Sequence, residues 1–128
     1  MPFDSPHHAP IGDLEILMDT RNRVSNQRKW VKGSFRDGDR HCLVGALCLA
    51  CGSRSLAIPN RKERRLARML ANQLPSHAPF CTRIRLVPAR QRLMWFNDDP
   101  RTCHEDVMTL FDRAIDHLTT GVQRYVSA

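Results

Sequence analysis

Long hydrophobic runs are missing from this sequence. Its longest apolar stretch covers residues 42–51 and is interrupted by Gly45, whereas a membrane-spanning helix needs about 20 consecutive apolar residues. The first ten residues hold three prolines and Asp4 but no apolar run, which is not the pattern of a secretory signal. We therefore expect a soluble cytoplasmic protein without a membrane partner.

A repeated metal-binding pattern is also missing. Five cysteines are present, and an odd number without a secretory signal indicates reduced thiols. Cys48 and Cys51 form a CxxC on the apolar face of a predicted helix, where free cysteine is a common core residue, and no second CxxC follows. We expect no metal and no cofactor; the alternative is a zinc site completed by Cys81, Cys103 and His104.

Two common nucleic-acid-binding patterns are absent as well. Aromatic residues make up 6% of the chain and form no aromatic RNA-binding motif. The helices predicted near residues 40–51 and 60–74 are separated by about eight residues, which is too long for the short turn of a helix-turn-helix. Binding to nucleic acid would therefore depend on charge.

Positive charge is abundant and unevenly distributed. The formal net charge is +7, and 17 of the 20 basic residues are arginine. The net charge is +1 over residues 1–52, +9 over residues 53–96 and −3 over residues 97–128. The basic middle can face an anionic partner, or it can attract the acidic C-terminal segment within the fold or in a second copy.

Helical periodicity predicts four helices. The first begins at residue 10 or 11, and the second covers residues 40–51 with Asp39 as its N-cap. The third follows a possible cap at Asn60 and ends near residue 74, and the last begins with a capping box at Thr102 and Glu105. The second helix is apolar on most sides, which is typical of a central, buried helix.

The remaining segments are less regular. The glycines of residues 30–39 predict a loop or a short hairpin. Residues 76–94 are ambiguous: Ile84 and Leu86 alternate with arginines as in a short strand, whereas residues 88–94 could start a helix. The chain is thus predicted to be all-α or α-dominated, with room for one short hairpin. Its 128 residues suit one small compact domain over residues 10–128, preceded by a flexible segment of residues 1–9.

Two short motifs resemble a known family. Residues 42–47 read Cys-Leu-Val-Gly-Ala-Leu, and residues 97–102 read Asn-Asp-Asp-Pro-Arg-Thr before Glu105-Asp106-Val107. Between Leu14 and Leu118 the chain resembles short uncharacterised bacterial and phage proteins, which join a Cys-x-x-Gly-Ala-Leu helix start to a Trp-Asn-Asp turn and a final amphipathic helix. Phe96 stands at the position of that Trp, with Trp95 one place earlier. The resemblance implies a compact helical fold and no particular activity.

A thiol-based catalytic site is one functional hypothesis. Cys42 falls in the first turn of the predicted second helix, where the helix dipole lowers the pKa of a thiol. His104 is a chemically suitable base, and Asp98 or Asn97 could orient its imidazole. The alternative for Cys42 is a buried side chain that packs beside Gly45.

An arginine-rich helix face is the other hypothesis. Four residues of the third predicted helix lie on the side away from its leucines: Arg61, Arg64, Arg65 and Arg68. Clustered cations of this kind suit phosphate binding, although such a face is often only solvated. Four later arginines could extend it: Arg83, Arg85, Arg90 and Arg92.

These patterns favour an uncharacterised small basic intracellular protein that binds or regulates without catalysis. Its partner would be nucleic acid, another anionic molecule, or a protein, including a second copy in a homo-oligomer. The alternative is a small thiol-dependent hydrolase or transferase that uses Cys42 and His104.

Overall fold

Helices make up most of the described chain. The computed structural model describes residues 8–53, 57–78 and 80–127. In chain order the elements are α1 (His8–Val24), η2 (Gln27–Lys29), β1 (Arg36–Asp37), β2 (Arg40–His41), α2 (Leu43–Ala50), α3 (Arg61–Ala71), η3 (Phe80–Arg83), α4 (Ala89–Asp98) and α5 (His104–Ser127). The predicted α-dominated single domain with one hairpin is confirmed. Of the segment predicted to be flexible, residues 1–7 lie outside the described residues, and the next two belong to α1.

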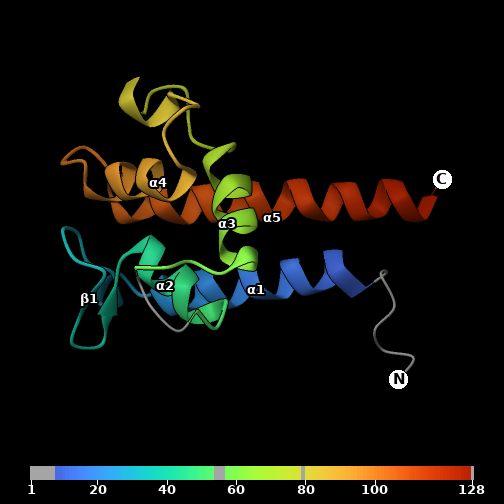
Figure 1. Cartoon of the computed structure of the whole chain (residues 1–128), viewed down its shortest axis with the longest axis horizontal. Coiled ribbons are helices and arrows are strands. Elements are labelled where there is room, and N and C mark those ends of the chain that lie inside the picture. The colour runs from blue at the N-terminus through green and yellow to red at the C-terminus, as the bar shows by residue number, and fades with distance from the viewer. Residues whose placement is uncertain (1–7, 54–56, 79, 128) are drawn as a thin grey trace.

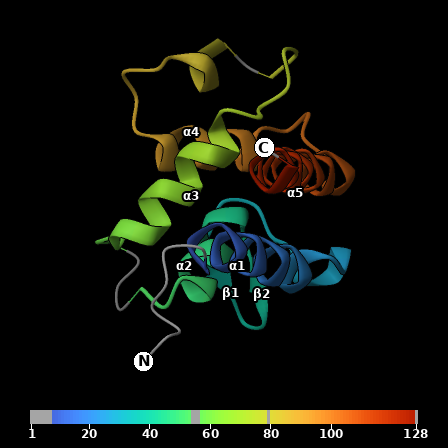
Figure 2. The ribbon, with the colours of Figure 1, turned by 90° about the vertical axis from the view of Figure 1, so that its right-hand side faces the viewer.

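The long helices α1 and α5 run antiparallel along the length of the molecule, and α3 crosses them (Figure 1). Seen along that length, α1 and α2 lie on one side and α4 and α5 on the other (Figure 2). The core between them includes Leu17 and Val24 of α1 and Leu110 and Phe111 of α5, none more than 1% exposed. In the described part of the chain, no helix has both the length and the apolar character needed to cross a membrane.

The central helix α2 is shorter than predicted. Its residues from Leu43 to Cys48 are buried, as expected of an apolar core helix. The predicted start near residue 40 is wrong, because residues 40–41 pair with residues 36–37 as the antiparallel hairpin β1–β2. Asp39 forms an ion pair with Lys29 instead of capping the helix. The N-cap is Cys42, whose Sγ accepts the Gly45 N–H at 3.2 Å.

Close approach at Gly45 joins the hairpin to α2. A Cβ built on Gly45 would clash with the carbonyl oxygen of Phe35 and lie 3.1 Å from its carbonyl carbon. The same Phe35 oxygen accepts the N–H of Cys42 at 3.2 Å. The glycine therefore lets the Phe35 backbone lie directly against the first turn of α2.

The third helix begins as predicted. The Oδ1 of Asn60 accepts the N–H of Glu63 at 2.8 Å, which satisfies one of the donors left open at a helix N-terminus. Leu66 and Leu70 are fully buried, and the arginines occupy the opposite side. The helix ends at Ala71, three residues before the predicted end.

The segment between α3 and α4 contains no strand among its described residues. The strand suggested by Ile84 and Leu86 is wrong, because the Val87 N–H bonds the Ile84 oxygen at 3.1 Å and closes a turn.

The start of α5 is one residue later than predicted. The backbone N–H of Cys103 donates to Asp106 Oδ2 at 2.9 Å, so this pair takes the capping role expected of Thr102 and Glu105.

Candidate functional site

Asn97, at the end of α4, is the centre of a buried polar cluster. Its side chain is fully buried. Its Oδ1 accepts hydrogen bonds from Trp30 Nε1 at 2.6 Å and from the Leu43 N–H at 3.1 Å. Its Nδ2 donates to the Val31 oxygen at 3.1 Å and to Asp98 Oδ1 at 3.0 Å. With both amide atoms engaged twice, Asn97 joins α4 to the start of α2 and to the segment after η2, and it has no capacity left to orient a histidine.

The two aspartates after Asn97 also hold the backbone. Asp98 Oδ1 accepts the N–H of Gly33 at 2.8 Å, and the Asp99 carbonyl oxygen accepts from Lys32 Nζ at 2.6 Å. The Asp99 carboxylate accepts from the N–H and Nε of Arg101, which lowers the pKa of Asp99. These contacts order the turn that leads into α5.

Cys42 and His104 have separate hydrogen-bond partners. The Nε2 of His104 lies 2.7 Å from the Val24 oxygen, and its ring lies against Trp30 with centroids 5.7 Å apart. The thiol of Cys42 accepts from Gly45, and burial raises the pKa of that thiol. Within the described chain no hydrogen bond links the thiol to the imidazole. The contacts of Cys42, Asn97, Asp98 and His104 therefore favour a structural role, and a catalytic one stays a prediction.

The rate of alkylation should distinguish the exposed cysteines of this protein from the buried ones. In native protein near neutral pH, iodoacetamide should label the exposed Cys81 and Cys103 first. Cys42 and Cys51 should react only in denaturant, because burial raises the pKa of Cys42 and raises the pKa of Cys51 to about 12, which leaves little reactive thiolate. Peptide mass spectrometry on timed samples measures the order. Rapid native labelling of Cys42 would contradict this expectation and support the thiol-enzyme hypothesis.

A second buried polar cluster was not predicted. Glu63 is fully buried, with Oε1 accepting from Ser53 Oγ at 2.8 Å and Oε2 lying 3.3 Å from Arg90 Nε. The Arg90 guanidinium also lies over the ring of Phe35, 5.2 Å from its centroid. The sequence held a signal for this cluster, because Glu63 is the one acid of residues 53–96 and shares a helix face with Leu66.

Two hollows flank Phe35. One, of about 500 Å³, is lined in part by Arg90, Gln91 and Met94. The other, of about 200 Å³, is lined in part by His41 and Cys48. Burial raises the pKa of Cys48, and the negative charge of the nearby Glu63 carboxylate raises this pKa further by a smaller amount. Among the described residues no group of three or more His, Cys, Asp or Glu side chains is placed to hold a metal ion, including around the predicted CxxC.

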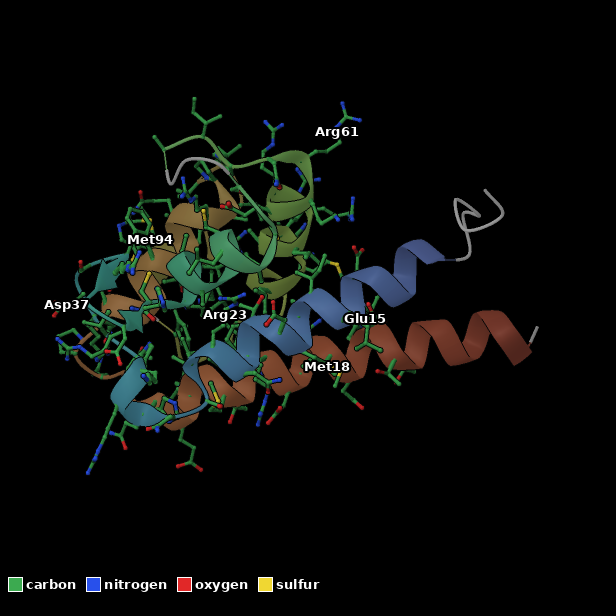
Figure 3. The ribbon with its side chains drawn as sticks, turned by 90° about the horizontal axis from the view of Figure 1, so that it is seen from below. Glu15, Met18, Arg23, Asp37, Arg61 and Met94 are labelled. Atoms are coloured by element: carbon green, nitrogen blue, oxygen red, sulfur yellow. The ribbon has the colours of Figure 1, made fainter. Side chains whose placement is uncertain are left out.

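The arginine face of α3, defined as Arg61, Arg64, Arg65 and Arg68, is exposed as predicted. Arg65 forms a two-pronged pair with Asp13 of α1, at 3.1 Å from Nε and 2.6 Å from Nη2. The other three form no ion pair with a carboxylate of the described chain. Figure 3 shows Arg61 pointing away from the body of the molecule.

Only two of the four later arginines that were predicted to extend this face are exposed. Arg83 and Arg85 are exposed, as a surface role requires. Arg90 pairs with the buried Glu63, and Arg92 is buried and donates from Nε to the Thr82 oxygen at 2.7 Å. Arg90 and Arg92 therefore stabilise the fold, and their inward direction follows from their positions on α4, which the sequence pattern alone did not settle.

Comparison with known protein families gives a match that covers most of this chain. No curated protein and no solved structure matches this chain. Residues 9–117 match the Family of unknown function (DUF6197), and that range includes both the Asn97 cluster and the arginine face. Because the match covers most of the sequence, the chain belongs to the Family of unknown function (DUF6197).

Proposed function

We propose that this protein binds nucleic acid without catalysis, through contacts between the arginine face of α3 and the phosphate backbone. The observation that carries the proposal is the set of exposed guanidinium groups on one side of one helix. Arg61, Arg64 and Arg68 have no carboxylate partner in the described chain, whereas many other arginines of this protein are paired. An uncompensated row of cations favours a polyanionic partner.

The geometry of the row suits a phosphate backbone. Arg61 and Arg68 are seven residues apart, so their Cα atoms are separated by about 10 Å along the helix axis, with Arg64 between them. Guanidinium groups match phosphate oxygens as two-pronged donors. The pair between Arg65 and Asp13 fixes α3 against α1 and presents the row on a rigid helix. Contacts of this kind position a protein on nucleic acid but do not read its sequence.

Removing two of these cations should weaken binding. For Arg64→Gln with Arg68→Gln, we expect the Kd for a labelled duplex to rise about tenfold at low salt, and the slope of log K against log salt to flatten by about two units, one for each lost phosphate contact. Fluorescence anisotropy over a salt series, with DNA and RNA duplexes of several sequences, measures both quantities. Wild-type affinity should vary little with base sequence.

The matched control keeps the same change in net charge. Arg28 and Arg113 are exposed and outside α3, and neither pairs with a carboxylate of the described chain. The Arg28→Gln with Arg113→Gln variant should bind nearly as well as wild type. Equal weakening in both variants, or no binding by wild type at low salt, would contradict the proposal. A change of oligomeric state in light scattering for Arg64→Gln with Arg68→Gln would instead indicate that this face docks on a second copy.

A further inference from the structure

A tight turn between η3 and α4 carries an apolar side chain at its tip. The N–H of Val87 bonds the oxygen of Ile84 at 3.1 Å, which places Arg85 and Leu86 at the two central positions of the turn. Leu86 is 96% exposed, the largest exposure among the large apolar side chains of the described residues, and Ile84 beside it is 37% exposed. The turn thus presents one leucine next to an exposed arginine.

The base of this turn is rigidly held. Arg92 of α4 is buried and donates to the oxygen of Thr82, which is itself fully buried in η3. Pro88 follows the turn directly and precedes the first residue of α4, where its fixed φ restricts the backbone. These contacts already restrict the segment that carries the turn. Fixing the turn on a partner therefore costs less conformational entropy.

The segment that carries the turn and helix α3 lie on one side of the molecule. Figure 2 shows the segment that leads from η3 to α4 on the side where α3 lies, beyond α3 and away from α1 and α2. A duplex that lies along α3 therefore has this segment on the same side of the protein. Proteins that deform DNA use this combination, an apolar wedge that enters a base step with arginines beside it.

We infer that Leu86 is a wedge that inserts between base pairs of a bound duplex, with Arg85 contacting the adjacent phosphate. The inference rests on the proposed nucleic-acid function and assigns a second, separate contact to it. A single leucine is enough to separate one base step, whereas an anchor on a lipid surface needs a broader apolar face. The preferred site is a flexible pyrimidine–purine step such as TA, because such steps unstack most easily.

Base unstacking tests the wedge directly. A duplex with 2-aminopurine in one central TA step should become more fluorescent when wild-type protein saturates it, because the unstacked base is no longer quenched. Leu86→Ala should abolish most of that increase while its Kd stays within about fivefold of wild type, because phosphate contacts supply most of the affinity. A duplex with an A-tract at the same place should give little increase, since A-tracts are stiff.

The control and the possible outcomes separate the two proposals. Leu49→Ala is the control, because it shortens a different leucine, which lies on α2 and is 43% exposed. This variant should behave as wild type. The Arg64→Gln with Arg68→Gln variant should need more protein to saturate the duplex but reach the same final fluorescence. Tight binding without a fluorescence increase, or an unchanged increase in Leu86→Ala, would overturn the wedge and leave the arginine face intact. Absence of binding by wild type would overturn both.

Discussion

Replacing Asn97 with alanine should cost about 3 kcal/mol or more of unfolding free energy, because it leaves several buried polar groups without partners. The Trp30 indole N–H and the Leu43 backbone N–H both lose their acceptor, and the Val31 oxygen loses a donor. Each such buried group costs about 1–3 kcal/mol when it cannot be rehydrated. The change therefore acts on α2, α4 and the segment after η2 together.

Urea unfolding, followed by circular dichroism, measures this loss. Asn72→Ala is the matched control, since Asn72 is exposed at the C-terminal end of α3, and we expect it to change stability by less than about 0.5 kcal/mol. A loss below about 1 kcal/mol for Asn97→Ala would mean that water replaces the amide, and that the cluster does not hold these elements together.

Replacing Gly45 with alanine should destabilise the protein by a similar amount, about 3 kcal/mol, for a steric reason. The added Cβ would overlap the Phe35 carbonyl oxygen, which is backbone and cannot turn aside. The hairpin would have to move away from α2, and the Cys42 N–H would lose its bond to Phe35. Thermal and urea unfolding should both report the change.

A second glycine provides the control for this effect. Gly12 lies within α1, and a Cβ built on it meets no atom within 4 Å. Gly12→Ala should therefore be neutral or stabilise by up to about 1 kcal/mol, because alanine favours the helix. Equal stability of Gly45→Ala and wild type would show that the hairpin moves freely, and that close packing at Phe35 is not required.

Local rules predicted much of the fold and part of the candidate site. The start of α3 was predicted from Asn60, whose side chain caps the helix through near neighbours. The exposure of the arginine face followed from the spacing of its leucines, because residues three and four apart share one side of a helix. A loop or a short hairpin before α2 was expected from the glycines of this segment, and Gly38 does adopt a positive φ of 66° in the hairpin that forms.

Only the tertiary structure decided the remaining features. Asn97, Trp30 and Leu43 are far apart in the sequence, and their shared hydrogen bonds exist because α4 packs beside α2. Packing of α4 against α3 and η3 pairs Arg90 with Glu63 and buries Arg92, while Arg85 stays exposed, although all three belong to one basic stretch. Sequence by itself determined which residue types lie on each helix face, since periodicity is local. Which faces meet depends on contacts between distant segments, and these turn Arg90 toward Glu63 and bury Arg92, while Arg61, Arg64 and Arg68 remain exposed.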